Sequence, residues 1–507
     1  MRTLNSAKNF ISSLGITLTM IILGFITRKI FVDNIGIEYL GLNGLLQNIL
    51  GVMSLLEGGF ATSVVYNLYK PLAENDQPKI IALLQLYKKV YRYIALGICI
   101  CALIIYPFIN YFIKDAESLS YVSIVYFIFL FNSIIQYFTA YKWSIINASQ
   151  KLYKLTTINL IYQIGLNISK LAILYYTQNY ILYLIIESIF GIGLNIAIVR
   201  TANRLFPYLL TNNKYQVESS TKKNIITNMK ALFLHSVGGY FMHSTDNIVI
   251  SSFVGISTVG IYSNYTLILG TIGNMVGQIL NSFSESVGNL IAMESSDKIY
   301  HVFQTIFFVN FLVISIPIII IHNTITPFIQ WWLGDEYVLG YSTLCIILIN
   351  FYINNMRNSA LTFKTKAGIF TKDRYTPLLQ GIINLTLSLI LVQHWGLSGV
   401  LVATAISILS IGFWQFPRLI YKYTFRKSLW NYFKMYIFYT TVGFCTLLTS
   451  FCLCQFNHIQ NLLYQTIFNG VISICCILVI FYALFYKTIA FNELKAYTYT
   501  VYKSIIS

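Results

Sequence analysis

The sequence predicts an all-α polytopic membrane protein with about fourteen transmembrane helices, arranged as two six-helix lobes followed by two further helices. Three observations lead to this prediction: an apolar composition, long uncharged runs, and a sequence pattern that repeats at a fixed offset. Of the 507 residues, 56% are hydrophobic and only 10% are charged, whereas soluble domains carry about 25% charged residues. Runs such as 11–27 and 305–321 lack charge over roughly the length that a helix needs to cross the hydrocarbon layer.

The apolar chain divides into spans at its charged and polar gaps. The predicted spans are 10–32, 40–66, 90–113, 120–143, 156–177, 180–200, 230–254, 259–284, 302–323, 341–363, 376–393, 397–417, 432–454 and 462–486. The first run exceeds the core of a secretory signal and no small-residue cleavage site follows it, so we expect it to remain as a span. The spans group into an N-terminal lobe (1–204), a cytoplasmic linker (205–229), a C-terminal lobe (230–421) and a two-helix appendage (422–507).

The basic residues predict the orientation of these spans. With the N-terminus in the cytoplasm, the inner segments hold 29 of the 34 Lys and Arg residues, which is the positive-inside asymmetry of membrane proteins. Both termini are therefore expected in the cytoplasm. The formal net charge of +17 follows mostly from this topology, and its expected partner is the anionic lipid of the inner leaflet rather than nucleic acid.

Two stretches of the chain share one pattern at an offset of 219 residues. The triplet IGI at 35–37 corresponds to VGI at 254–256, and Gly41 corresponds to Gly260. The glycines predict a tight reversal of the chain after the first span of each lobe. Six spans separate the two copies, and because this number is even, both lobes face the same way. The pattern thus predicts a parallel repeat, an arrangement in which transporters rock two bundles about a central site.

Three motifs carry a family resemblance. They are TDNIVISSFVGISTVGIYSNYTLIL at 245–269, LLEGGFATSVVYNLYKPLAEND at 55–76, and HWGLSGVLVATAIS at 394–407. In this order and topology the chain resembles the polysaccharide and O-antigen repeat-unit flippases (Wzx type) of the multidrug/oligosaccharidyl-lipid/polysaccharide (MOP) flippase superfamily. The resemblance covers essentially the whole chain, including the count of fourteen spans.

The resemblance implies a transport function in the bacterial inner (cytoplasmic) membrane. The implied substrate is a polyprenyl-pyrophosphate-linked oligosaccharide for O-antigen, capsule or another surface polysaccharide, moved from the cytoplasmic to the periplasmic leaflet by alternating access. The expected partners are membrane lipids and, for a monomeric flippase, the polysaccharide polymerase and chain-length machinery. No GxxxxGK[ST] motif is present, so no cofactor is expected and a proton or sodium gradient is the expected energy source.

Charges inside the spans mark the candidate substrate site, because a charge at mid-membrane is costly unless it has a role. A pyrophosphate needs cationic partners, and the candidates are Arg28, Lys170 and Arg357. Asn354 and Asn358 flank Arg357, which suits a wet surface better than lipid. For Arg28 the alternative is that the side chain extends to the outer head groups.

Acidic residues and one histidine form a second candidate set, for gating or ion coupling: Glu57, Glu187, Asp246 and His243. By the repeat, Asp246 is equivalent to Thr27, next to Arg28, so an ion pair between Arg28 and Asp246 could close an outer gate. A packed or hydrogen-bonded histidine is the alternative to a proton relay for His243.

Other classes of protein compete with the flippase interpretation. A lipid II flippase or a MATE-type drug or cation antiporter of the same superfamily is the nearest alternative, and the antiporter would need an acidic, compact cavity. A membrane glycosyltransferase or polymerase is disfavoured because no outer loop is long enough to hold a transfer site, so no enzymatic activity is expected. The eight cysteines lie inside apolar spans and are expected to be buried hydrophobes, with no metal site.

Overall fold

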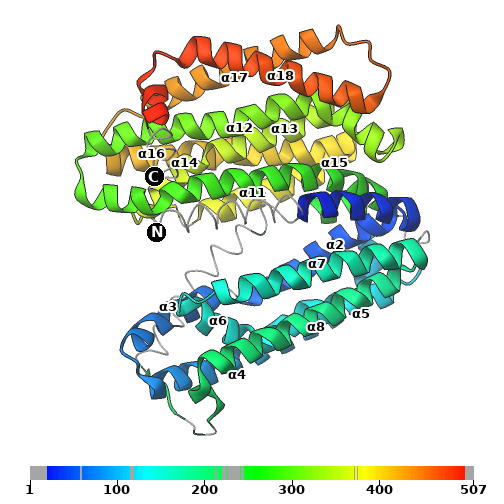
Figure 1. Ribbon diagram of the computed structural model, residues 1–507, viewed down its shortest axis with the longest axis vertical. Coiled ribbons are helices and arrows are strands. Elements are labelled where there is room, and N and C mark those ends of the chain that lie inside the picture. Colours follow the sequence, from blue (N-terminus) through cyan, green and yellow to red (C-terminus); the bar gives the residue numbers. More distant parts are fainter. Residues whose placement is uncertain are drawn as a thin grey trace. The chain divides into compact units, whose positions relative to one another are not determined.

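A computed structural model of the chain shows a protein built from helices (Figure 1). The structure describes residues 20–57, 60–114, 119–211, 213, 215–219, 225, 240, 245–369, 372–373 and 375–496. No strand occurs in these ranges, which confirms the predicted all-α class. The chain folds into two compact units. We call Ile22–Gly260 the N-terminal unit, and the chain from Ile261 onward the C-terminal unit.

The N-terminal unit begins at Ile22, within the first described helix, which covers residues 20–35. Its further helices are α2 (Ile37–Met53), α3 (Phe60–Ala73), α4 (Gln77–Ile105), α5 (Val122–Ile135), α6 (Ala140–Ala148), α7 (Tyr153–Tyr176), α8 (Tyr180–Leu205) and α10 (Asp246–Phe253). Side chains cap several of the helix starts, where backbone N–H groups have no partner within the helix. Asp76 accepts from the N–H of Lys79 at α4, and Asn179 accepts from that of Leu182 at α8.

The C-terminal unit contains the remaining helices. They are α11 (Ile256–Met293), α12 (Ser296–Trp332), α13 (Tyr341–Met356), α14 (Asn358–Lys366), α15 (Thr376–Ser407), α16 (Phe413–Ile420), α17 (Trp430–Cys454) and α18 (Leu462–Phe485). The first residues of α11 belong to the N-terminal unit, and the helix continues into the C-terminal unit from Ile261. The predicted appendage, α17 and α18, packs along α12 (Figure 1).

Asparagines and serines attach the appendage to α12. The amide of Asn323 donates to the hydroxyls of Ser450 in α17 and Ser473 in α18, both at 2.9 Å. The amide of Asn469 in α18 donates back to the carbonyl oxygen of Asn323 at 3.0 Å. Such interhelical hydrogen bonds hold membrane helices together where lipid offers no hydrophobic driving force.

Among the described residues, seven helices are long and apolar enough to cross a membrane, and the bent pair Val122–Phe138 and Ala140–Ala148 adds an eighth if it forms one span. The predicted count of fourteen remains a prediction. One of the long helical stretches, Thr376–Phe425, includes two predicted spans, 376–393 and 397–417.

A glycine-based hairpin separates these two spans within α15. Gly396 has a φ of 53°, a backbone conformation that glycine adopts readily. After the break the chain runs back on itself, because Asn384 donates to the Thr404 hydroxyl at 2.9 Å and Gln380 donates to the carbonyl oxygen of Ser407 at 3.3 Å. A Cβ on Gly399 would lie 2.2 Å from the carbonyl oxygen of Leu391, so the turn requires glycine here as well.

The repeat-related glycines occupy equivalent places in the structure. Gly36 and Gly255 both have positive φ, 104° and 151°, and each lies just before a new helix, α2 or α11. A glycine with positive φ therefore interrupts the helical chain at both positions, and the tight reversals remain a prediction. Five residues after these glycines, Gly41 and Gly260 bring α2 and the start of α11 into backbone contact within the N-terminal unit.

Candidate functional site

A cavity of about 490 Å³ with several polar side chains in its wall lies in the N-terminal unit. We call it the carboxylate cavity, because Glu57 and Glu187 both line it. Its other polar lining residues include Asn132, Gln136, Thr139, Trp143 and Asn195. The sequence places these groups on α5, α6, α8 and the turns beside them, where each polar side chain interrupts an otherwise apolar span. Cavities of this size, with a few converging polar groups, are typical ligand sites.

Local hydrogen bonds orient the polar walls of the cavity. Glu57, at the end of a short 3₁₀ turn (Ser54–Glu57), is hydrogen-bonded to the side chain of Tyr137 and to the backbone of Ala61. The Thr139 hydroxyl donates to the side-chain oxygen of Asn195, whose own amide donates to the carbonyl oxygen of Gly191 at 2.9 Å. These bonds hold the carboxylate and amide groups in defined positions before any ligand enters.

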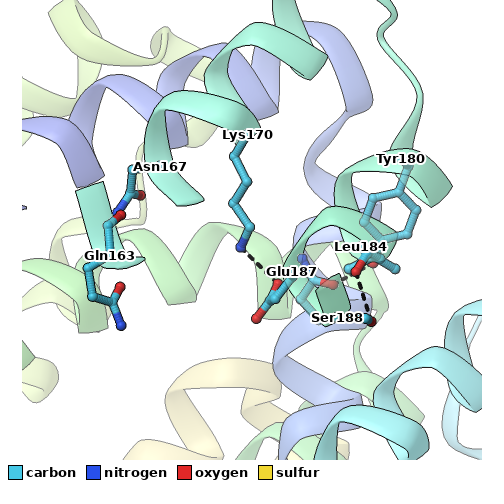
Figure 2. Close-up of polar contacts among 8 residues, drawn as sticks. Gln163, Asn167, Lys170, Tyr180, Leu184, Glu187 and Ser188 are labelled. Atoms are coloured by element: carbon cyan, nitrogen blue, oxygen red, sulfur yellow. Dashed lines mark hydrogen bonds and ion pairs between the residues drawn. The ribbon is translucent and has the colours of Figure 1, made fainter. Parts of the chain in front are cut away.

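Glu187 connects the cavity to a basic residue. The Lys170 Nζ atom on α7 lies 2.8 Å from Glu187 Oε2 on α8 (Figure 2). The Lys170 side chain is 12% exposed and that of Glu187 is 44% exposed, so the ammonium group is the more enclosed partner. The ion pair neutralises one of the two cavity carboxylates. It joins two residues that the sequence analysis assigned to different roles, Lys170 to substrate binding and Glu187 to gating or ion coupling.

Lys170 also contacts the ring of Tyr183. The Lys170 Nζ atom lies 4.5 Å from the centre of the Tyr183 ring, within the range of a cation–π interaction. The Phe31 ring packs edge-on against Tyr183 with centroids 5.2 Å apart, which seats the helix over residues 20–35 on the start of α8. Arg28, one turn before Phe31, lies close enough to Tyr183 for electrostatic interaction. Arg28, Lys170 and Glu187 therefore gather around one tyrosine.

Asp246 is the first residue of α10, which packs against α2 in the N-terminal unit. A carboxylate in the first turn of a helix is favoured by the helix dipole. Thr27, its equivalent by the 219-residue offset, is buried. The ion pair between Arg28 and Asp246 remains a prediction, and His243 lies outside the described residues.

Arg357, Asn354 and Asn358 belong to the C-terminal unit. Arg357 breaks the predicted span 341–363 into α13 and α14, and it is 8% exposed. Its Nη2 atom donates to Asn354 Oδ1 at 2.6 Å, and its guanidinium lies 5.7 Å from the ring centre of Phe416 on α16. The Asn358 amide donates to Asn355 Oδ1 at 3.3 Å.

The same phenyl ring also contacts a buried ion pair. Lys364 Nζ lies 4.8 Å from the Phe416 ring centre and pairs with Asp373. Both side chains are nearly inaccessible, 3% and 2% exposed. Lys364 is thus enclosed together with a carboxylate. Phe416 lies between two cations that hold α14 against α16.

Several cavity residues were not among the sequence candidates. Asn132, Gln136, Asn195 and Trp143 were missed because single amides and tryptophans occur in many apolar spans. The available signal was the spacing of Asn132 and Gln136, which are four residues apart and so share one face of a helix. Among the described residues, no group of three or more His, Cys, Asp and Glu side chains could hold a metal ion.

Comparison with solved structures defines the fold. The chain is similar to the lipid II flippase MurJ in an inward closed conformation, with a TM-score of 0.68 and 15% identity over 92% of this chain and 98% of that one. It is also similar to an inward-facing multidrug resistance MATE family transporter of the MOP superfamily, with a TM-score of 0.60, 14% identity, and coverage of 79% and 94%.

A third similar structure is a MOP superfamily transporter from Pyrococcus furiosus, described as having a binding pocket of reverse polarity. Its TM-score is 0.53 at 13% identity, with coverage of 82% of this chain and 94% of that one. The chain therefore has the fold of MOP superfamily transporters. The sequence matches no protein-family model and no curated protein.

Proposed function

We propose that this protein is a flippase that moves a polyprenyl-pyrophosphate-linked oligosaccharide from the cytoplasmic to the periplasmic leaflet by alternating access. The observation that carries the proposal is the carboxylate cavity within an otherwise apolar helical unit, one of whose carboxylates, Glu187, pairs with Lys170 beside Tyr183. The fold supports it, because a lipid II flippase aligns with 92% of the chain. The proposal involves no catalytic chemistry.

The chemistry of such a substrate matches the groups in the N-terminal unit. A glycan is rich in hydroxyl groups, which bond to carboxylates and amides such as those of Glu57, Asn132 and Asn195. Trp143 offers an apolar face with a polar N–H. Lys170 and Arg28 are the proposed partners of the pyrophosphate, while the polyprenyl tail stays in lipid.

Glu57 is the proposed site of ion coupling. Its carboxylate lies in the cavity wall and is hydrogen-bonded to Tyr137 and Ala61. A carboxyl group in such a place can bind a proton or a sodium ion, and either would bias the equilibrium between two conformations. Membrane lipids, and a polysaccharide polymerase with its chain-length machinery, are the proposed partners of a monomeric protein in the bacterial inner membrane, with both termini in the cytoplasm.

A drug or cation antiporter is the second candidate, and a specific observation favours it. Two carboxylates line a compact cavity, which suits a cationic ligand. Lys170 weakens this argument because it neutralises Glu187. The flippase proposal therefore depends on the cations beside the cavity, and the antiporter proposal depends on Glu57.

Transport in liposomes distinguishes these functions. The purified chain is reconstituted with a fluorescent prenyl-diphosphate-linked saccharide, and the rate at which the label becomes inaccessible to an external quencher is measured. We expect protein-dependent movement of the saccharide lipid, with no uptake of a cationic dye such as ethidium. Dye uptake without saccharide movement would support the antiporter instead. In cells, deletion should trap lipid-linked repeat units on the cytoplasmic side, and normal surface glycan in a strain without a second exporter would contradict the proposal.

A further inference from the structure

A second polar pocket of about 590 Å³ lies where three loops of the N-terminal unit meet. These loops are the α3–α4 turn, the α6–α7 turn and the segment after α8. We call this site the loop pocket and define it by the lining residues Tyr69, Asn75, Gln77, Gln150, Lys151 and Tyr208. All three loops are on the side that the positive-inside pattern predicts to be cytoplasmic.

The pocket presents hydrogen-bonding groups that the fold itself does not use. The side-chain amides of Asn75, Gln77 and Gln150 have no hydrogen-bond partner among the described residues. Each amide can both donate and accept. Three such groups around one cavity suit a ligand with many hydroxyl groups.

One cation and two aromatic rings complete the lining. Lys151 is the charged residue of the pocket, and its Nζ atom lies 5.1 Å from the ring centre of buried Phe206, which holds the ammonium group in place. Tyr69 and Tyr208 add ring faces and hydroxyl groups. Burial raises the pKa of the Tyr208 phenol, so this hydroxyl stays protonated and can donate at neutral pH.

Backbone strain occurs at two of these positions. Asn75 and Gln150 have φ values of 54° and 59°, in the left-handed region that is unfavourable for most residues with a side chain. Glycine would relieve this cost but would also remove the amide. The presence of amide residues in both strained turns is consistent with a use for their side chains.

We propose that the loop pocket binds the anionic saccharide head group of the lipid-linked substrate at the cytoplasmic surface, before it enters the carboxylate cavity. This inference rests on the proposed function. The three amides match the sugar hydroxyls, the tyrosine rings match the sugar faces, and Lys151 matches one negative charge. An anionic phospholipid alone would need basic residues and would leave the amides unused.

Photochemical capture tests the location of the head group. The full chain carries the photoreactive residue p-benzoylphenylalanine in place of Tyr208, or, as a control, in place of Tyr153, a tyrosine on the same surface that is 67% exposed and does not line the pocket. The probe is farnesyl-diphosphate-linked N-acetylglucosamine in detergent micelles. We expect capture at position 208 at least five times that at position 153. Equal capture at the two positions would overturn the inference.

Two variants test the chemistry of the pocket. Gln150→Gly keeps the left-handed turn while removing an amide, and Lys151→Met keeps the apolar stem while removing the charge. Each should lower capture at position 208 at least threefold, whereas Lys154→Met, an exposed lysine in the same segment, should leave it unchanged. Capture that is unaffected by both variants, or that is as strong with farnesyl diphosphate or phosphatidylglycerol as with the saccharide probe, would overturn the assignment.

The outcome can be separated from that of the proposed function. If the wild-type protein moves the saccharide lipid in liposomes but position 208 captures no probe, the loop pocket inference fails and the flippase proposal stands. If the wild-type protein neither moves nor captures the lipid, both fail together. Size-exclusion profiles matching the wild type confirm that each variant is folded.

Discussion

Gly41 and Gly260, which are 219 residues apart, lie against each other at a reciprocal helix crossing. A Cβ on Gly41 would lie 2.0 Å from the carbonyl oxygen of Ile256, and a Cβ on Gly260 would lie 2.3 Å from that of Ile37. Ile37 and Ile256 are themselves related by the same offset. The crossing is therefore locally two-fold symmetric, with each copy of the motif packing on the other.

A neighbouring contact follows the same symmetry. The Ser257 hydroxyl donates to Glu38 Oε1 at 3.4 Å, and these positions are also 219 residues apart. The repeat thus gives equivalent positions that meet at one point of the N-terminal unit. Small residues allow this close backbone approach, as at other helix contacts in membranes.

Alanine at either glycine should destabilise the protein. Gly41→Ala or Gly260→Ala forces the two backbones apart, and we expect a loss of about 1 to 3 kcal/mol, because overpacking of a tight contact costs this much. The loss of stability in the double variant should be smaller than the sum of the two single losses, since both changes force apart the same pair of backbones. Thermal unfolding in detergent measures this.

Gly24→Ala is the matched control for the glycine contact. Gly24 lies in the helix over residues 20–35, and an added Cβ would meet nothing within 4 Å. The change should leave stability unchanged or raise it by up to about 1 kcal/mol, because alanine favours the helix. An equal loss at positions 24 and 41 would rule out the crossing as the cause.

Removal of Lys170 should affect both stability and transport. Lys170→Met leaves Glu187 without its ionic partner, and we expect a loss of about 1 to 3 kcal/mol. This is less than the roughly 3 to 5 kcal/mol for a fully buried pair, because the Glu187 side chain is 44% exposed. The double variant Lys170→Met/Glu187→Gln should recover much of the stability but not transport of the anionic substrate. Recovery of transport as well would show that Lys170 does not bind the pyrophosphate.

The ion pair of Lys364 and Asp373 should be sensitive to the loss of one partner. Lys364→Met leaves a buried carboxylate uncompensated, which costs about 3 to 5 kcal/mol. Lys364→Met/Asp373→Asn should be more stable than the single variant. Lys366→Met, at an exposed lysine two residues away, should change the unfolding temperature little. If both lysine variants behave alike, burial of the pair does not determine the stability here.

Charge reversal tests the proposed gate between Arg28 and Asp246. Arg28→Asp or Asp246→Arg alone should abolish most transport, because each places two like charges together. The double reversal should restore it in the liposome assay if the two side chains form a pair. A double variant no better than the single variants would show that the residues do not interact in the transport cycle.

Most helices could be predicted from the local pattern of the sequence. Predominantly apolar runs predicted the α8, α17 and α18 segments within a few residues, because a helix that crosses lipid must be apolar along most of its length. The turns at Gly36, Gly255 and Gly396 were also predictable, since each needs a backbone conformation that glycine adopts readily. The candidate charges were likewise identifiable, because charge is rare in these spans.

The sequence by itself determined that the chain is helical, apolar and internally repeated, and it marked the residues whose burial needs an explanation. Only the tertiary structure decided which of them meet: Lys170 with Glu187, Lys364 with Asp373, and Gly41 with Gly260. The physical reason is that apolarity and backbone conformation act along the chain, whereas a buried charge or a close crossing depends on which other segment the fold brings beside it. Partners on other helices leave no local pattern around the residue they contact.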